Sequence, residues 1–146
     1  MLNFIVNLFS YNWISLFLIL SIFQNSDNQI IFNKFIKQIN VPLKNDAIYI
    51  LVPSVICKGC VEFYLLQIDQ KFYKKEKYLI TQNKYIYLKF YQKNNFYTFL
   101  DSLNIMNEIP FKPSLITFIT FNNKKMNIYS ISNTKEEINF SKLLNE

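Results

Sequence analysis

The chain has 146 residues, of which 51% are hydrophobic and 18% aromatic; this is enough apolar material for one compact domain and argues against disorder. Its net charge is +6, but all sixteen basic residues are lysine, and the lack of arginine argues against nucleic acid as a partner. The lack of histidine excludes Ser-His-Asp and Cys-His catalysis and most zinc or iron sites.

The first 26 residues contain no charged side chain, and residues 13–23 form an apolar run interrupted only by two serines. Residues 2–23 are about long enough to cross a bilayer as one helix. No basic residue precedes the run and no small-residue cleavage site follows it. We therefore expect residues 1–26 to be an uncleaved signal anchor in the cell membrane, with the domain 27–146 on the exported (periplasmic or extracellular) side. The alternatives are secretion after cleavage and a buried core helix, which the lack of charge argues against.

After the anchor, the pattern predicts a helix, a strand and a second helix. Residues 30–39 place four apolar side chains on one helical face: Phe32, Phe35, Ile36 and Ile39. Residues 47–55 are almost wholly apolar, which is typical of a buried central strand. Residues 61–72 follow the sequence CKGC and again show helical spacing, at Val61, Leu65, Ile68 and Phe72. The two cysteines therefore lie where a strand leads into a helix.

The second half of the chain continues the alternation. Residues 77–91 are rich in strand formers and favour one or two strands, with a turn near residues 82–84. Residues 94–105 favour a helix capped by Asn94 or Asn95, with a face formed by Phe96, Phe99, Leu100 and Leu103. Residues 113–121 and 126–131 flank the sequence NNKK and indicate a hairpin. Thr134 and Glu137 have capping-box spacing and predict a final helix. This order favours an α/β fold, a mixed sheet with helices on both faces.

Both cysteines and the chain's one glycine lie within four positions, in Cys57-Lys58-Gly59-Cys60. Two cysteines with this spacing at a helix start are close enough to form a small disulfide ring. The unpaired backbone N–H groups, the helix dipole and the Lys58 charge favour a thiolate on Cys57, which makes Cys57 the expected nucleophile. Cys60, one turn into the helix, would be more buried and would resolve a mixed disulfide. Gly59 has no side chain and would let a partner approach the pair.

Three features together resemble the thioredoxin fold. A strand runs into Cys57–Cys60 at a helix start, Pro113 stands just before a strand in KPSLITF, and a hairpin and a terminal helix follow. The resemblance covers roughly residues 30–146. It implies a thioredoxin-like three-layer sandwich, with a mixed central sheet and helices on both faces, preceded here by the N-terminal hydrophobic helix.

The resemblance also implies roles for individual residues. Cys57 and Cys60 would be the catalytic, redox-active disulfide, and Gly59, Lys112 and Pro113 would contact the substrate. Pro113 looks like the family's cis-proline, which faces the cysteine pair, and Pro110 is a second candidate. The chain departs from the family at Ile56, where thioredoxins often carry tryptophan. It also departs at Leu51, where thioredoxin itself has a buried acidic residue that assists proton transfer.

Together these features predict a membrane-tethered or exported thiol–disulfide oxidoreductase that acts on protein thiols and disulfides with an unidentified redox partner and without a cofactor or metal. Whether it oxidises or reduces depends on its redox potential. The alternative is a redox-inactive thioredoxin-like binding module that recruits a partner protein through its aromatic surface. A Cu(I) carrier ranks last, because no methionine or histidine lies beside the pair. The lysine cluster YKKEKY at residues 73–78 fits a solvated helix end better than a nucleic-acid contact.

Overall fold

The computed structural model describes residues 27–54, 57–91, 95–110, 116–122 and 124–131. Within these ranges the chain forms a five-stranded mixed sheet of order β3-β2-β1-β4-β5. The parallel part consists of β1 (Ala47–Val52), β2 (Glu76–Thr81) and β3 (Tyr97–Leu100). The antiparallel part adds β4 (Ile116–Asn122), which pairs with β1, and β5 (Lys125–Ile131), which pairs with β4.

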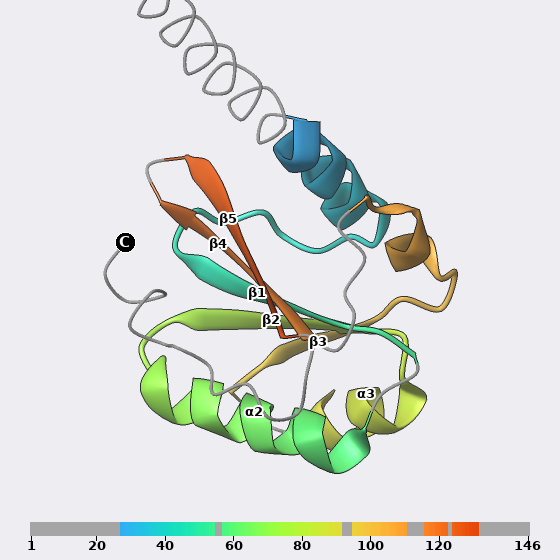
Figure 1. Cartoon of the computed structure of the whole chain (residues 1–146), viewed down its shortest axis with the longest axis vertical. Coiled ribbons are helices and arrows are strands. Elements are labelled where there is room, and N and C mark those ends of the chain that lie inside the picture. The colour runs from blue at the N-terminus through green and yellow to red at the C-terminus, as the bar shows by residue number, and fades with distance from the viewer. Residues whose placement is uncertain (1–26, 55–56, 92–94, 111–115, 123, 132–146) are drawn as a thin grey trace, which may run out of the picture.

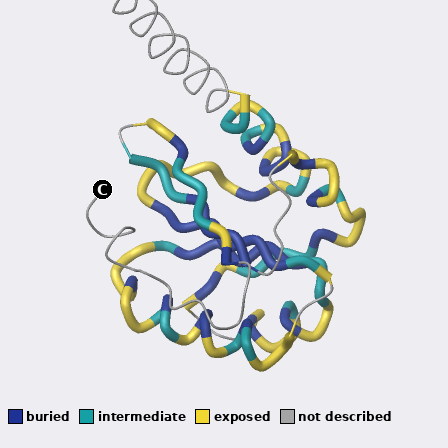
Figure 2. The backbone as a smooth tube through the Cα atoms, viewed as in Figure 1, coloured by how far each residue is buried: buried dark blue, intermediate teal, exposed yellow. Residues whose placement is uncertain are grey.

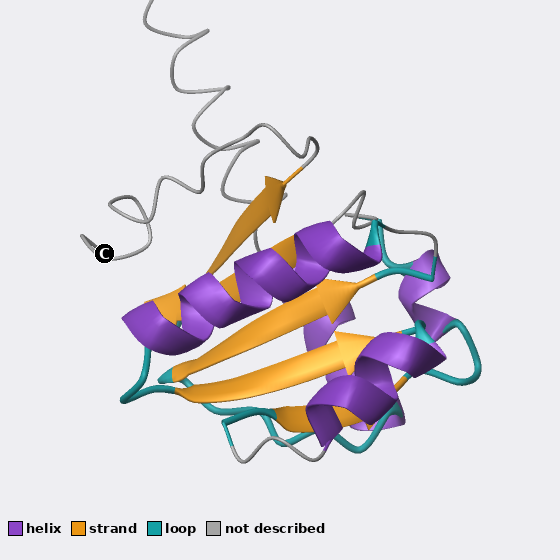
Figure 3. Cartoon of the chain, turned by 90° about the horizontal axis from the view of Figure 1, so that it is seen from below, coloured by secondary structure: helices purple, strands orange, loops and turns teal. Residues whose placement is uncertain are grey.

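Helices cover both faces of this sheet (Figure 1). Helices α2 (Lys58–Lys71) and α3 (Lys84–Tyr91) lie side by side on one face, as Figure 3 also shows from below. The helical residues 27–38 and the 3₁₀ helix η1 (Ile105–Glu108) lie on the opposite face. The predicted α/β class with a mixed sheet between helices is therefore confirmed.

The central strand β1 separates two hydrophobic cores, and all six of its residues are buried (Figure 2). Its side chains alternate between the faces, as in any strand. Ile48, Ile50 and Val52 pack with apolar residues of α2 and α3. Ala47, Tyr49 and Leu51 pack with the helix of residues 27–38 and with η1. The prediction of a buried central strand is confirmed, and its carboxyl end leads directly towards the cysteine pair.

Three further predicted elements are confirmed. The helix expected in residues 30–39 spans residues 27–38, with Phe32, Phe35 and Ile36 at most 1% exposed and Ile39 partly buried in the turn that follows. All four apolar positions predicted along α2 are buried, the last one, Phe72, just after the helix end. The hairpin is formed by β4 and β5, and Lys124 has a φ of 68° in its turn.

The second part of residues 77–91 is a helix, so the prediction of strand structure there was wrong beyond Thr81. Asn83 caps α3, because its Oδ1 accepts the backbone N–H groups of Tyr85 (3.1 Å) and Ile86 (3.2 Å). Ile86 and Phe90, four residues apart, bury the same face against the core. A side-chain cap and this spacing outweigh the strand propensity of the tyrosines.

The helix predicted for residues 94–105 was also wrong, because this segment contains strand β3. Pairing with the edge of β2 places Tyr97 opposite Tyr78, and the two rings stack with centroids 5.2 Å apart. Phe96 is buried against Phe90 with centroids 5.5 Å apart. Leu103, expected on the helix face, is 79% exposed. Backbone pairing and cross-strand aromatic contact therefore override the helical spacing.

Some predictions lie outside the described residues: the anchor in residues 1–26, the final helix after residue 131, and Lys112 and Pro113. Pro110 is described, and no peptide bond among the described residues is cis, so Pro110 is not a cis-proline. Of the helices that the structure describes, none combines the length and apolar character needed to cross a membrane.

Candidate active site

A disulfide joins Cys57 and Cys60 at the start of α2, with their Cα atoms 5.3 Å apart. Cys57 is the N-cap residue of the helix and is exposed. Cys60 lies in the first turn, is partly buried and packs against the core beneath α2. An attacking thiol therefore has access to Cys57 first, which is the order of exposure that the sequence predicts.

The position at the helix start gives the pair a positive electrostatic environment. The Cys57 carbonyl already accepts the Val61 N–H at 3.1 Å, while the first helical N–H groups have no partner within the helix. The first turn contains no acidic residue, and Lys58 follows Cys57 directly. Reduction of the disulfide would therefore produce a Cys57 thiolate next to the positive end of the helix dipole.

The Lys58 side chain reaches across to α3. Its Nζ lies 4.8 Å from the centroid of the Tyr85 ring, within the range of a cation–π contact. The Tyr85 hydroxyl donates to Glu62 Oε1 at 3.0 Å, and Lys89 pairs with the same carboxylate. The hydrogen bond to Glu62 raises the pKa of Lys89 above its usual value. This cluster links the start of the cysteine-bearing helix to α3.

A second link between α3 and the site passes through Asn83. Its Nδ2 donates to the carbonyl of Ser54 at 3.1 Å, in the segment that leads from β1 towards Cys57. Its backbone N–H donates to Thr81 Oγ1 at 3.0 Å. Because Val52 pairs with Thr81 in parallel register, the ends of β1 and β2 lie at the same edge of the sheet. Asn83 therefore connects Ser54, which lies between β1 and Cys57, to the start of α3.

The sequence pattern does not mark Asn83 and Tyr85 as parts of the site. Residues 82–84 are predicted as a turn between strands, so α3 and its side chains were not expected. The signal was present: an asparagine stands just before a segment in which Ile86 and Phe90 are four residues apart. The contact of Lys58 with Tyr85 joins positions 27 residues apart in the chain and follows only from the parallel pairing of β1 with β2.

The structure describes only part of the predicted substrate-binding set. Gly59 is exposed with a negative φ, and a Cβ added there would meet nothing within 4 Å. The backbone therefore does not require glycine at this position. Lys112 and Pro113 lie outside the described residues, so their approach to the pair stays a prediction.

Leu51, which the resemblance would place where thioredoxin has a buried acid, is fully buried in the core on the side of residues 27–38. The buried polar residues in the described part of the chain are Lys77, Thr81, Asp101 and Thr117. The Asp101 carboxylate accepts the N–H groups of Ile105 and Met106 and therefore serves as a cap for η1. Among the described residues that form the core beneath Cys60, none is acidic.

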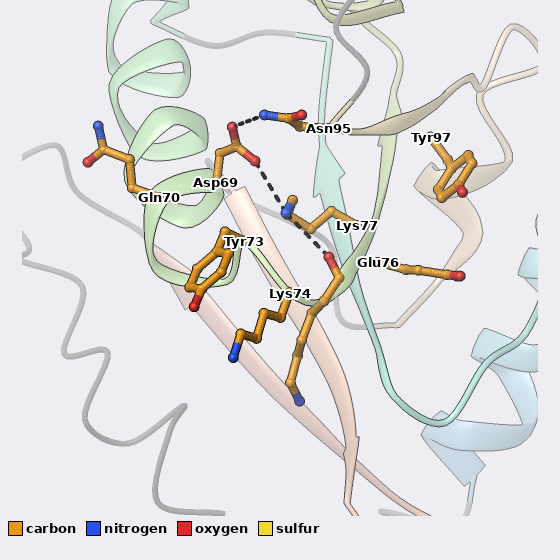
Figure 4. A pocket seen from close by; sticks show the side chains of 9 residues that line it. Asp69, Gln70, Tyr73, Lys74, Glu76, Lys77, Asn95 and Tyr97 are labelled. Carbon is orange, nitrogen blue, oxygen red and sulfur yellow. Dashed lines mark hydrogen bonds and ion pairs between the residues drawn. The ribbon is translucent and has the colours of Figure 1, made fainter.

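A polar pocket of about 510 Å³ lies at the far end of α2 (Figure 4). Its floor is Lys77, whose ammonium donates to the carbonyls of Phe72 (3.0 Å) and Lys75 (3.3 Å) and pairs with Asp69 Oδ1 (3.2 Å). Within YKKEKY, then, Lys77 is buried rather than solvated as predicted, whereas Lys74 and Lys75 are exposed. The three protons of the Lys77 ammonium thus have partners within the chain: two backbone carbonyls and one carboxylate.

Comparison of the chain with protein-family models, with curated proteins and with solved structures gave no match in any of the three. What the geometry establishes is a mixed five-stranded α/β sheet in which a strand leads to a Cys-x-x-Cys disulfide at a helix start. Within the described residues, no group of three or more Cys, Asp or Glu side chains could hold a metal ion.

Proposed function

We propose that the protein is a thiol–disulfide oxidoreductase that exchanges electrons between the Cys57–Cys60 pair and the thiols or disulfides of other proteins. The observation that carries the proposal is the disulfide itself, with an exposed Cys57 at the N-cap of α2 and a partly buried Cys60 one turn further on. A ring closed by a sequence separation of 3 adds little stability, so structural reinforcement is a weak reason for the bond.

In the reducing direction, the Cys57 thiolate attacks one sulfur of a substrate disulfide and releases the other sulfur as a thiolate. Cys60 then loses its proton and attacks the Cys57 sulfur, which releases the second substrate thiolate and forms the Cys57–Cys60 bond. The two substrate thiolates take up two protons, and the cysteine pair is oxidised by two electrons. The oxidising direction is the reverse of these steps, and the redox potential decides between them.

We further propose that the domain is a divergent thioredoxin-like fold tethered to a membrane through residues 2–23, with Gly59, Lys112 and Pro113 at the substrate site. The strand–disulfide–helix order and the antiparallel hairpin next to β1 support the fold proposal. Fractionation of cells that express the full chain, with protease treatment of intact cells, tests the tether. A chain that washes off membranes with carbonate would refute it.

The experiment that tests the activity uses the full chain in detergent and a neutral small disulfide, hydroxyethyl disulfide. We expect the reduced protein to consume this compound, and we expect Cys60→Ala to accumulate the mixed disulfide on Cys57. Cys57→Ala should do neither, since the exposed nucleophile is removed. A reversible two-electron transition in thiol–disulfide buffers would give the potential. Cysteines that never exchange with these buffers would refute the proposal.

The second candidate, a redox-inactive binding module, is favoured by exposed apolar side chains on the two helices beside the disulfide. On α2, Phe63 is 58% and Leu66 48% exposed, and on α3, Leu88 is 57% exposed. Such side chains suit contact with a partner protein. Under this alternative, Cys57→Ala would leave partner binding intact, and the wild-type protein would turn over no model disulfide.

A further inference from the structure

Among the described residues near the Cys57–Cys60 disulfide, two lysines are not paired with carboxylates. We propose that this site selects substrates in which carboxylates flank the reacting disulfide, so that acidic polypeptide segments are its preferred substrate class. The inference rests on the proposed oxidoreductase function and adds the chemistry that chooses among disulfides.

Lys58 provides the first positive charge. It is exposed, and its ammonium lies over the face of the Tyr85 ring, 4.8 Å from the centroid. A cation over an aromatic face keeps its charge and its outward N–H donors. In the described part of the chain, Lys58 forms no ion pair with a carboxylate. The contact with Tyr85 therefore holds the ammonium between the first turn of α2 and α3 without neutralising it.

Lys84 provides the second positive charge, from the neighbouring helix. It is the first residue of α3, and it directly follows Asn83, which donates to the Ser54 carbonyl in the segment leading to Cys57. Lys84 is exposed, and no ion pair joins it to a carboxylate among the residues that the structure describes. The first turn of α3 contains no acidic residue, and neither does that of α2.

Among the residues that the structure describes, the nearby carboxylates do not cancel these charges. Glu62, on the side of α2 that faces α3, is compensated by Lys89, with an N–O distance of 2.5 Å, and by the Tyr85 hydroxyl. Asp101 is 2% exposed and turned onto backbone N–H groups. Glu108 lies in η1, on the opposite face of the sheet from α2 (Figure 1). Lys58 and Lys84 therefore leave an excess of positive charge on the helix side of the site.

The excess charge acts on both steps of the exchange. A carboxylate next to the attacked sulfur is drawn towards Lys58 and Lys84 as the Cys57 thiolate approaches, which offsets the repulsion between the thiolate and an anionic substrate. The released thiolate carries an additional negative charge that the same lysines stabilise as it leaves. Two unit charges about 7 Å apart in water change a rate by about threefold, so two lysines can produce a measurable preference.

The test compares three small disulfides of increasing charge with the reduced full chain: dithiodipropionate (anionic), hydroxyethyl disulfide (neutral) and cystamine (cationic). Each rate is divided by that of 2-mercaptoethanol with the same compound, which removes the intrinsic reactivity of the disulfide. We expect the normalised anionic rate to exceed the cationic rate by about 80-fold at low salt, because each of the two lysines speeds the anion about threefold and slows the cation about threefold. The ratio should fall towards one at high salt, where screening is strong.

Substitutions of single lysines show which charges cause the preference for anionic disulfides. Lys58→Gln and Lys84→Gln should each lower the anionic-to-cationic ratio by about ninefold, because each removes a charge that speeds the anion and slows the cation. Lys74→Gln is the matched control: Lys74 also lies over a tyrosine ring, that of Tyr73, but beyond the far end of α2. It should leave the ratio unchanged. Because the ratio compares two substrates of one protein, altered reactivity of Cys57 itself cancels.

The outcomes separate this inference from the proposed function. No reaction with hydroxyethyl disulfide rejects the function and the inference with it. Reaction with hydroxyethyl disulfide at an anionic-to-cationic ratio of one or below rejects the inference alone, as does an equal loss in Lys74→Gln and Lys58→Gln. Peptide disulfides with aspartate or lysine beside the cysteine identify the source of the carboxylates. If the aspartate-to-lysine rate ratio of these peptides exceeds the anionic-to-cationic ratio of the small disulfides, acidic polypeptides are supported as the substrate class. A smaller peptide ratio overturns that assignment in favour of small anionic disulfides.

Discussion

Substitution of Lys77 by methionine should destabilise the domain far more than a change in an ordinary surface lysine. The Lys77 side chain is 3% exposed, and its ammonium has three partners: the Asp69 carboxylate and the carbonyls of Phe72 and Lys75. Methionine keeps an apolar stem of similar length in the same space. The change therefore isolates the charge and its contacts, while most of the packing stays intact.

The expected loss in the free energy of unfolding depends mainly on Asp69, whose carboxylate loses the Lys77 ammonium. Removing one member of a fully buried ion pair costs about 3–5 kcal/mol. Asp69 is 21% exposed and keeps its hydrogen bond from Asn95, so water can compensate part of its loss. The variant is also spared the cost of burying an ammonium. We therefore expect a loss of about 2–3 kcal/mol in the free energy of unfolding, near the lower limit of the range for buried pairs.

Urea unfolding of the full chain, followed by tyrosine fluorescence or circular dichroism, measures this loss. Lys75→Met is the matched control, because Lys75 is 45% exposed and pairs with Asp46, which is 91% exposed. An exposed pair of this kind contributes at most about 1 kcal/mol. The double variant with Asp69→Asn should recover part of the Lys77→Met loss. Equal effects of Lys77→Met and Lys75→Met would refute the claim that the buried ammonium stabilises the domain.

Three further predictions concern the sheet and the links to α3. Hydrogen bonds from Lys44 and Tyr78 lower the pKa of Glu76 below its usual 4.5, so its contribution to stability is present above that pH and is lost as the pH falls through the folded-state value. Urea midpoints of Glu76→Gln and wild type should therefore converge as the pH falls below 4.5, and a constant difference would contradict this. Burial raises the pKa of Tyr49 and Tyr78 above 10.0, so their contribution is present below that pH and is lost as the pH rises through the folded-state values. In an ultraviolet titration Tyr49 and Tyr78 should ionise above pH 10.0, and ionisation of both at or below that pH would count against burial as the cause. Asn83→Ala should cost about 1–2 kcal/mol through loss of the α3 cap. Asn83→Asp keeps the acceptor but loses the donor to Ser54, so it should cost less than half as much; equal losses in urea unfolding would assign the effect to the Ser54 contact instead.

The sequence predicted those parts of the fold that one local pattern determines. The unbroken apolar run of β1 and the helical spacing along α2 were sufficient, because both elements bury residues at the period of their own backbone. The spacing of Cys57 and Cys60 at the strand-to-helix junction also predicted the disulfide, because it too is a local pattern.

The errors lie where contacts distant in sequence decide the structure. In β3, pairing with β2 and the stacking of Tyr97 on Tyr78 override a helical spacing that the chain also contains. In α3, the Asn83 cap is a local signal, but the burial of Ile86 and Phe90 in the core depends on contacts distant in sequence. Because α3 supplies Tyr85 and Lys84, this local error hid the neighbours of the cysteine pair.

The alternation of β1 side chains between two cores has a consequence for native-state hydrogen exchange. Its backbone pairs with β2 on one side and β4 on the other, so its amides can open only when both ladders and both cores are disrupted. We expect the slowest-exchanging amides to lie in β1, and their rates to be nearly the same whether the disulfide is oxidised or reduced. The redox state then changes the start of α2 without loosening the strand that leads to it.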